Sequence, residues 1–551
     1  MKNLSMPRFL YCVLKYFSVV IFLVSCSAEG QVDWKVKPQS PALRASVEAV
    51  KSKEFPNAKS SLRDSDLILE KIKALESTIS QLQKNISTSN SIPAFQSGDV
   101  SWILTSSALV FMMTIPGLAM FYGGLVRVQN VLSTVMQSFS IACLITILWV
   151  LFGYSLAFDT GGKVFGSHQK FWLQKVKLTG FHPLFPSIPE PLFVVYSLTF
   201  AIITPALISG AFADRMRFGP MLVFIGLWHL LVYCPIAHST WMTDGFLHSA
   251  GVMDFAGGNV VHVAAGCAGL MSSIVVGKRA GYGREVFSHH NILISVLGAS
   301  LLWVGWCGFN GGSALGERYP GQPTGVTSGL AATSVLNTNL AAATASLTWM
   351  CTEWMIRKRP SVLGIISGMF SGLVTITAGA GYVNVTGAFC MGFLAGPVCY
   401  FAAQLKHRFG YDDALDAFGI HAPGGALGGI LTGFFATEEI TGKGSGKNGA
   451  FYGNPKQIYL QMYGVAFSAI WSLIVSYILL KLVDMTLGLR VAIEDELSGL
   501  DMVCHGESLV PFHLDPDGNI NRSSLELPRS CSLEADVESS PSKQGEGNGF
   551  I

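Results

Sequence analysis

Apolar residues gather in long runs between Ser101 and about Met485, and short polar segments separate these runs. Most runs have about the 20 residues that an α-helix needs to cross a bilayer. Eleven spans are predicted, at 101–126, 130–158, 191–213, 219–238, 257–277, 290–312, 328–356, 362–379, 383–405, 418–436 and 460–485. The pattern therefore predicts an all-α polytopic membrane protein whose membrane domain occupies residues 99–487.

The first 28 residues have a different pattern. Basic residues precede a ten-residue apolar run at 16–25, and small residues follow it. Ten residues are too few to span a bilayer, but they are typical of the apolar core of a signal peptide. The stretch Leu-Val-Ser-Cys at 23–26 also resembles a bacterial lipobox, in which Cys26 would be lipidated. Cleavage after Ala28 is the alternative.

Residues 29–98 are polar and charged, which predicts an extracytoplasmic region. Within it, isoleucine and leucine recur at alternating spacings of four and three, at Ile68, Ile72, Leu75, Ile79 and Leu82. This spacing predicts a helix at about 62–85 with a short heptad seam. The helix either forms a coiled coil or lies with its apolar face on the protein or the lipid surface.

An odd number of spans places the two chain ends on opposite sides of the membrane. With a cleaved signal peptide the N-terminus is extracytoplasmic, so the tail at 488–551 is expected to be cytoplasmic and, from its polar composition, disordered after about 520. Basic residues in alternate loops support this orientation in a plasma or inner membrane. They are Arg127, Arg215, Arg217, Lys278, Arg279, Arg284, Arg357, Lys358, Arg359, Lys406 and Arg408.

Composition excludes several classes of protein. Half of the residues are apolar and 13% are charged, well below the charged share of soluble domains. A formal net charge of +2 leaves no basic excess for nucleic acid. The 11 cysteines are isolated, so neither a zinc site nor a disulfide framework is indicated. No nucleophile, base and orienting group recur at an enzymatic spacing, so an enzyme is not expected.

Two predicted spans, the fifth and the tenth, each begin with a histidine in a similar context. The residues Asp254-Phe255-Ala256-Gly257 precede His262, and Asp416-Ala417-Phe418-Gly419 precede His421. Glycines follow each histidine at i+4 and i+7, on the same helical face. Glycine on this face allows close helix packing, so the two imidazoles are expected to meet. The five-span interval predicts two inverted five-helix repeats plus a final helix, an architecture of many transporters.

Ionisable residues inside a membrane span indicate function. Burial disfavours the imidazolium cation, so both rings are expected to be neutral, with one donating a hydrogen bond to the other. Such a pair can pass a proton or hydrogen-bond a small polar solute. No carboxylate or cysteine accompanies either histidine at a ligand spacing, so no metal site is expected.

Several long motifs occur together in one order. They are Pro116-Gly117-Leu118-Ala119-Met120-Phe121-Tyr122-Gly123-Gly124, the stretch from Asp254 through Gly258 to His262, Gly305-Trp306-Cys307-Gly308-Phe309-Asn310, and Asp416 to His421. In these motifs the chain resembles the ammonium transporter family (Amt/Mep/Rh), and its Amt branch most closely. The resemblance covers roughly residues 100–507.

The resemblance implies a pathway. Phe200 and Phe309 resemble the stacked aromatic pair at the outer mouth, and Trp241 and Ser313 resemble the outer ammonium site. An indole face attracts a small cation by about 0.5–2 kcal/mol, and a hydroxyl oxygen can accept from its N–H. Asp254 resembles the acidic residue near this site, with a structural role at the start of a helix. Asp416 resembles its counterpart toward the cytoplasmic side.

The same resemblance implies an ammonium transporter that recruits NH4+, deprotonates it and conducts NH3, with or without the proton, past His262 and His421. It implies no cofactor, a homotrimer, methylammonium as a second substrate, and a PII-type regulator on the cytoplasmic face. An ammonium sensor with secondary transport is the alternative, although no output domain follows residue 490. A transporter coupled to Na+ or H+ is a further alternative.

Overall fold

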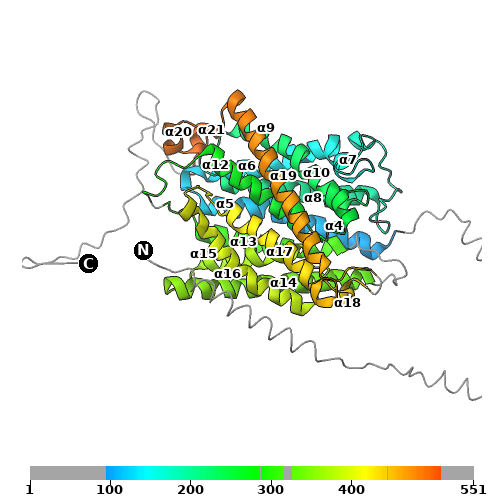
Figure 1. Ribbon diagram of the computed structural model, residues 1–551. Coiled ribbons are helices and arrows are strands. Elements are labelled where there is room, and N and C mark those ends of the chain that lie inside the picture. The colour runs from blue at the N-terminus through cyan, green and yellow to red at the C-terminus, as the bar shows by residue number, and fades with distance from the viewer. Residues whose placement is uncertain (1–94, 286, 315–325, 443–444, 510–551) are drawn as a thin grey trace, which may run out of the picture.

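The computed structural model describes residues 95–285, 287–314, 326–442 and 445–509 of the chain (Figure 1). All regular structure in these residues is helical, apart from four isolated β-bridges. The expected signal peptide at 1–28, the helix at about 62–85 and the tail after 520 lie outside the described residues.

Five helical segments build the first half of the membrane domain. Several of them contain short π-helical or 3-10 turns, so one segment comprises more than one element. The elements are α4 Ser97–Met112, η1 Met113–Leu118 and α5 Ala119–Leu125; η2 Val128–Asn130, α6 Val131–Leu148, η3 Trp149–Gly153 and α7 Tyr154–Phe158; α8 Glu190–Ile208 and η5 Ser209–Ala211; α9 Phe218–Trp228, η6 His229–Tyr233 and α10 Cys234–Trp241; and η7 Gly258–Val263 with α12 Ala264–Val276.

The second half is more regular. Its five segments are α13 Ile292–Ser313, α14 Val326–Arg357, α15 Val362–Thr377, α16 Val385–Phe409 and α17 Ala417–Phe435. The final segment is α19 Lys456–Leu487, which crosses the bundle diagonally in Figure 1. Shorter elements lie between or after these segments: η4 Phe171–Leu173, α11 Phe246–Ala250, α18 Glu438–Thr441, η9 Ala450–Tyr452, α20 Ile493–Ser498 and α21 Leu500–His505.

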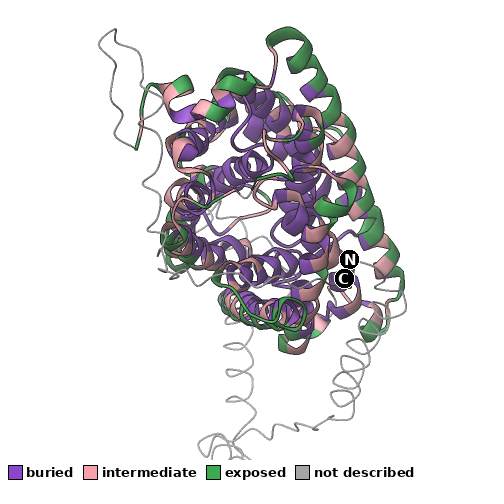
Figure 2. Cartoon of the chain, turned by 90° about the vertical axis from the view of Figure 1, so that its left-hand side faces the viewer, coloured by how far each residue is buried: buried purple, intermediate pink, exposed green. Residues whose placement is uncertain are grey.

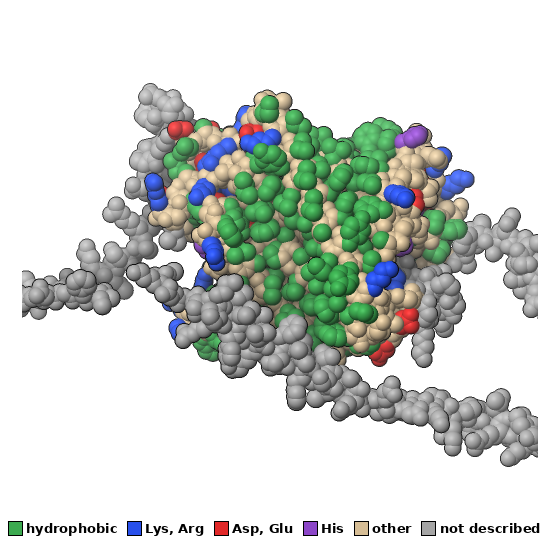
Figure 3. All heavy atoms as spheres, viewed as in Figure 1, with side chains coloured by type: hydrophobic (Ala, Val, Ile, Leu, Met, Phe, Trp, Pro, Cys, Tyr) green, Lys and Arg blue, Asp and Glu red, His purple; other side chains and the backbone are tan. Residues whose placement is uncertain are grey.

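The eleven helical segments of the described residues match the eleven predicted spans in order and position. Eight are long and apolar enough to cross a membrane; the other three are α14, α15 and α17. Hydrophobic side chains cover the middle of the face in Figure 3, while charged side chains lie toward its two ends. The prediction of an all-α polytopic membrane protein is confirmed.

Local sequence signals set several helix ends. The side chain of Asn291 accepts from the backbone N–H groups of Leu293 and Ile294, and Ser361 and Asn384 cap α15 and α16 in the same way. Such caps satisfy backbone donors that have no partner within the helix. At the other end of α16, Gly410 adopts a φ of 70°, a left-handed conformation that favours glycine.

The two halves pack by the same scheme. The first segment (α4 to α5) packs on α13, the first segment of the second half, and α12 packs on α17, the last segments of their halves. Within the halves, α6 contacts α8 and α9, just as α14 contacts α15 and α16. Because each half contains an odd number of crossings, equivalent helices run in opposite directions. The packing therefore has the pattern expected of two inverted repeats.

Glycine brings the two histidine-bearing segments together. A Cβ atom at Gly266 would lie 2.3 Å from the backbone nitrogen of Ala422, and one at Gly425 would lie 2.6 Å from the carbonyl oxygen of Gly258. Both distances are too short for any side chain. The i+4 glycines thus permit the close contact of α17 with both η7 and α12. Buried residues, purple in Figure 2, make up the interior of the bundle. The i+7 glycine of the second half, Gly428, instead faces the backbone of Thr375.

The segment after α19 folds back onto the helix ends at one face of the bundle. Glu496 of α20 is fully buried, accepts from the backbone N–H of Ala280 at 2.7 Å and pairs with Arg490 at 2.8 Å. Asp501 of α21 accepts from the backbone N–H groups of Leu132 and Ser133 at the start of α6. The first part of the tail is therefore docked on the membrane domain rather than extended from it.

Candidate functional site

A cavity of about 710 Å³ opens at the face that carries the segments 159–189 and 445–455; we call it the wide cavity. Aromatic and polar side chains line it, and the sequence-predicted residues Phe200, Trp241, Asp254 and Ser313 are all among them. Residues that are distant in the sequence, from the middle of α8, the ends of α10 and α13 and the turn before η7, therefore meet at one cavity.

The indole of Trp241 has a fixed orientation at the cavity wall. Its Nε1–H donates to the carbonyl oxygen of Asp254 at 3.0 Å. The ring of Phe158 lies nearly parallel to it, with centroids 6.2 Å apart and an interplanar angle of 8°, and Phe200 meets it edge-on at 6.0 Å. Held between these partners, the electron-rich indole can attract a small cation that enters the cavity.

Ser313 provides an oxygen at the same cavity. Its hydroxyl donates to the carbonyl oxygen of Phe309 at 3.0 Å, and its Oγ lies 3.2 Å from the hydroxyl of Tyr196. A hydroxyl that donates its hydrogen to a backbone carbonyl retains lone pairs on oxygen. Ser313 can therefore accept a hydrogen bond from an N–H group in the cavity.

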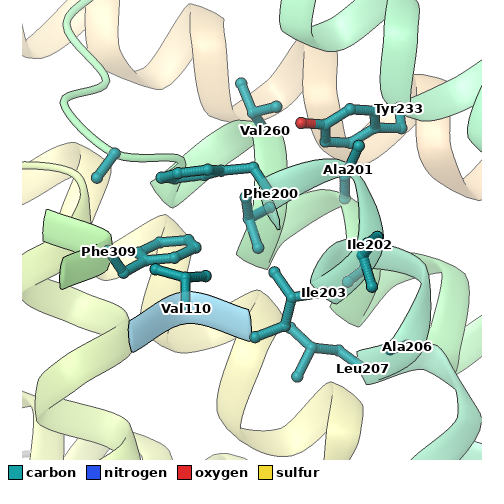
Figure 4. Close-up of a cluster of buried hydrophobic side chains, with 14 of the residues drawn as sticks. Val110, Phe200, Ala201, Ile202, Ile203, Ala206, Leu207, Tyr233, Val260 and Phe309 are labelled. Atoms are coloured by element: carbon teal, nitrogen blue, oxygen red, sulfur yellow. The ribbon is translucent and has the colours of Figure 1, made fainter. Parts of the chain in front are cut away.

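Phe200 and Phe309 close the inner end of the wide cavity. Their rings face each other in the close-up of Figure 4. The ring centroids are 4.1 Å apart and the interplanar angle is 23°. Phe309 is fully buried, and its ring lies 6.3 Å from the imidazole of His262 on the far side of the stack. In this conformation the two rings separate the wide cavity from the histidines.

His262 and His421 meet directly behind the phenylalanine stack. Their Nδ1 atoms are 3.3 Å apart and their rings are nearly parallel, with centroids separated by 5.3 Å. One Nδ1 donates and the other accepts, so two neutral rings of opposite tautomer satisfy this contact. Both are buried, at 1% and 7% exposure, and the Nε2 of His262 has no hydrogen-bond partner among the described residues.

A second, narrow cavity of about 20 Å³ lies on the other side of the histidine pair. His421, Trp306, Tyr122 and Asp416 are among its lining residues. The order through the bundle is therefore wide cavity, phenylalanine stack, histidine pair and narrow cavity. Within the described residues the phenylalanine stack and the histidine pair separate these two cavities.

Asp254 acts as a cap rather than as a free charge in the cavity. Its two carboxylate oxygens accept from the backbone N–H groups of four successive residues, at distances between 2.6 and 3.2 Å: Gly257, Gly258, Asn259 and Val260. Gly257 has a φ of 108°, which bends the chain so that these donors converge on the carboxylate. The cap fixes the start of η7, the π-helical segment that carries His262.

The cap that corresponds to Asp254 in the second half is made by Asp413, whereas the sequence led us to expect Asp416 as the counterpart. Asp413, not Asp416, accepts from the backbone N–H groups of Ala417, Phe418 and Gly419 at the start of α17. The side chain of Asp416 makes no cap and instead pairs with Lys406 at 2.7 Å. A φ of 58° at Asp416 turns its backbone into the left-handed region, so its side chain is not placed to reach the helix start.

Three aromatic contacts of the site were not predicted from the sequence. Trp306 stacks on His262 at 5.4 Å and donates from Nε1 to Thr377, and Phe158 stacks on Trp241. Tyr196 donates to the carbonyl of Phe309 at 2.8 Å and meets Phe200 edge-on at 5.2 Å. Trp306 stands in the motif with Phe309, a signal that could have identified it. Phe158 and Tyr196 lie in generic apolar runs.

The described residues contain no group of three or more His, Cys, Asp and Glu side chains arranged to hold a metal ion. The groups present instead suit a small nitrogenous cation or its neutral form, since the site combines aromatic faces, a hydroxyl acceptor and paired imidazoles.

Comparisons with known proteins agree on one family. The sequence profile of the Ammonium Transporter Family matches residues 101–509. The chain is 45% identical over 415 residues to an ammonium transporter of Bacillus subtilis, covering 75% of this chain and 98% of that protein. It is 42% identical to an ammonium transporter of Aquifex aeolicus, with 74% and 92% covered. The crystal structure of Candida albicans Mep2 superposes with a TM-score of 0.66 at 36% identity, covering 72% of this chain and 87% of that chain. The resemblance seen in the motifs is thus confirmed, and the chain belongs to the ammonium transporter family.

Proposed function

We propose that the protein is an ammonium transporter in which NH4+ enters the wide cavity, loses a proton near Phe200 and Phe309, and crosses the bundle as NH3 past His262 and His421. The observation that carries the proposal is the order of these groups: a cation-attracting cavity ends at an aromatic stack, and two paired imidazoles lie directly behind it.

Recruitment requires a surface that favours a small cation. The face of Trp241 supplies quadrupole attraction, and the Oγ of Ser313 accepts one N–H. The capped carboxylate of Asp254 adds a longer-range attraction without binding the cation directly, because its oxygens are already occupied by backbone donors.

Deprotonation provides selectivity, with the proton passing either to water in the open wide cavity or onward through the histidine pair. Moving an unpaired cation into an apolar interior costs several kcal/mol or more, while neutral NH3 avoids most of this cost. K+ has no proton to lose and is rejected at the same step. The rings of Phe200 and Phe309 must move to admit NH3, since they close the passage in the present conformation.

The histidine pair then offers NH3 a hydrogen-bonding path through the buried region. The Nε2 of His262 has no protein partner among the described residues, so it is available to the solute. The Nδ1 contact at 3.3 Å also connects the two rings for proton transfer, which would make transport electrogenic.

The remaining features of the proposal rest on sequence and family. We propose a plasma or inner membrane location with the N-terminus outside and the tail inside, a cleaved signal peptide at 1–28, and a domain order of 29–98, 99–487 and 488–551. A homotrimer, use of methylammonium and regulation by a PII-type protein are proposed from the family. In a trimer the 62–85 helices of three chains would lie together, so deleting residues 30–95 should weaken the trimer in detergent.

Flux and current across vesicles containing the full-length protein test the transport mechanism. Wild-type protein should move ammonium but not K+. His262→Ala and His421→Ala should each reduce ammonium flux or its selectivity over K+ by about tenfold, the effect expected for losing one buried hydrogen bond. His407→Ala is the matched control, since His407 is exposed at the end of α16. Unchanged flux and selectivity in both histidine variants would contradict the proposed pathway.

The same vesicles discriminate the alternatives. A sensor in which transport is secondary would bind ammonium without substantial flux. A transporter coupled to Na+ would lose flux when Na+ is removed from both sides, whereas the proposed mechanism does not require Na+.

A further inference from the structure

A lysine side chain occupies an aromatic face in the wall of the wide cavity. The Nζ of Lys447 lies 4.9 Å from the centroid of the Tyr382 ring, and both residues line the cavity. The Lys447 side chain ends in an alkylammonium group, the same chemical class as the protonated amines that the cavity would receive. The geometry is that of a cation–π contact.

The ring of Tyr382 is held rigidly for this contact. Its side chain is 3% exposed, and Phe255 meets it edge-on with centroids 5.4 Å apart. Gly381 is required next to it, because a Cβ atom there would lie 2.0 Å from the Phe255 ring. The backbone carbonyl of Tyr382 also accepts from the N–H of Thr437 at 2.9 Å, which ties the backbone of Tyr382 to the segment before α18.

The loop that carries Lys447 is also fixed by specific hydrogen bonds. The carboxylate of Glu438 accepts from the backbone N–H of Gly446 at 2.8 Å, and the side chain of Asn448 accepts from the backbone N–H of Glu438 at 2.9 Å. Ser445 accepts from the backbone N–H of Lys447 at 3.3 Å. These bonds surround Lys447 on both sides in the sequence, so its backbone is positioned at the cavity wall rather than free in solution.

The Tyr382 face is connected to the predicted ammonium site through two adjacent residues. Phe255 packs on Tyr382, and the preceding residue, Asp254, accepts the indole N–H of Trp241 through its carbonyl oxygen. Trp241 and Tyr382 therefore present two aromatic surfaces to one cavity of about 710 Å³. This volume is far larger than one ammonium ion needs, so both surfaces can be used by cations.

We propose that the face of Tyr382 is a second cation-binding surface of the wide cavity, and that the ammonium group of Lys447 competes for it with ammonium and small alkylammonium ions. Lys447 thus acts as a tethered competitor that weakens cation accumulation in the cavity. The inference deepens the proposed function, because it concerns access of the same substrate class to the same cavity.

Equilibrium binding to the purified full-length protein tests the inference apart from transport. Methylammonium chloride is titrated at constant ionic strength, with tryptophan fluorescence as the signal. Lys447→Gln should lower the apparent dissociation constant about three- to tenfold, the range expected when one cation–π face becomes available. Lys447→Arg keeps a cation on the ring and should bind as wild type does.

Two further variants separate ring occupancy from general charge. Lys163→Gln makes the same charge change at an exposed position of loop 159–189, outside the cavity lining, and should leave binding unchanged. Adding Tyr382→Leu to Lys447→Gln should abolish the gain in affinity. Equal shifts in Lys447→Gln and Lys163→Gln, no shift in Lys447→Gln, or a gain that survives Tyr382→Leu would each overturn the inference.

Vesicle flux measured on the same proteins distinguishes this inference from the proposed function. If wild-type protein binds methylammonium but transports neither it nor ammonium, the proposed function fails while the binding comparison still decides the role of Lys447. If transport is intact and the binding shift is absent, only the inference fails.

Discussion

Asp254 and Asp413 occupy equivalent positions in the two halves of the molecule. Each lies eight residues before the histidine of its half, at 254 and 262 and at 413 and 421. Each accepts backbone N–H bonds at the start of the segment that carries this histidine. The two imidazoles are therefore positioned by two carboxylate caps, one toward each face of the bundle.

The caps predict a ranking of stabilities among three variants. Asp254→Asn and Asp413→Asn each replace an acceptor-only carboxylate with an amide that has its own donors, so buried N–H groups lose partners. The expected cost is about 1–3 kcal/mol for each variant. Asp416→Asn removes an ion pair at a partly exposed position and should lower the free energy of unfolding by about 1 kcal/mol at most. Thermal unfolding in detergent measures the ranking, and an Asp416 variant as unstable as the Asp413 variant would contradict it.

The expectation of Asp416 where the structure has the Asp413 cap shows what the sequence could and could not provide. The two stretches before the histidines have similar composition, since each contains an aspartate followed within three residues by phenylalanine and glycine. This similarity pointed to Asp416, although Asp416 stands only five residues before His421. The constant spacing of eight residues to the histidine was available as a signal and identifies Asp413. The spacing to the histidine was the better guide because a capping side chain must reach the first free N–H groups of its helix. This requirement fixes the number of residues between the cap and the histidine on that helix.

The contact between the histidine-bearing helices predicts an effect of volume at Gly266. Gly266→Ala places a methyl group against the backbone of Ala422, which cannot move aside without separating the helices. Overpacking of this kind typically costs about 1–3 kcal/mol. The variant should also widen the spacing of His262 and His421 and so reduce ammonium flux. Thermal unfolding and vesicle flux measure the two effects.

Gly123→Ala is the matched control for this substitution. Its Cβ atom would meet only side-chain atoms of Val131 and Val135, at 3.6 Å, an ordinary contact distance. The same change of residue should therefore leave stability and flux close to those of wild type. Equal losses in Gly123→Ala and Gly266→Ala would show that helical glycine itself, rather than helix approach, is responsible.

Hydropathy predicted the spans well because a membrane helix must satisfy its own backbone hydrogen bonds and present apolar side chains. The π-helical turns were not predictable in this way. Hydropathy does not mark them, because η1 contains Pro116, whose missing backbone N–H removes one helical hydrogen bond, and η7 combines valines with Asn259 and His262. At η7, for example, the Asp254 cap and the turn at Gly257 shift the register of the first turn. The roles of Phe158 and Tyr196 were not identified from the sequence because they depend on partners that are distant in the sequence.

The docked tail predicts that Glu496 controls its attachment. Glu496→Gln leaves the cation of Arg490 without its carboxylate and weakens the bond from the Ala280 N–H. Removing one partner of a buried, hydrogen-bonded ion pair can lower the free energy of unfolding by about 3–5 kcal/mol. The loss here is expected to be smaller, because the side chain of Arg490 is partly exposed to solvent. Helices α20 and α21 should then release, with faster hydrogen exchange and proteolysis at 493–505. Glu494→Gln, at an exposed position of the same helix, should leave both unchanged.

The loop over the wide cavity should weaken in acid, through His182. Its Nε2 donates to the carbonyl of Phe158 at 2.8 Å and its Nδ1 accepts from the N–H of Leu184, so the folded loop requires the neutral ring. Burial lowers the pKa of His182 to about 4, against an ordinary value of about 6.5. Between these values the unfolded loop binds more protons than the folded loop. Stability is therefore complete above pH 6.5 and is lost progressively as the pH falls to 4.

The expected loss between pH 7 and pH 4.5 is about 2 kcal/mol. Hydrogen exchange of residues 176–189 at the two pH values measures it. Carboxylates elsewhere also titrate in this range, so the informative quantity is the difference between wild type and His182→Gln, whose amide can still donate to the Phe158 carbonyl but does not take up a proton. The variant should lose most of the acid sensitivity of this loop. If both proteins weaken equally in acid, groups other than His182 govern the loop.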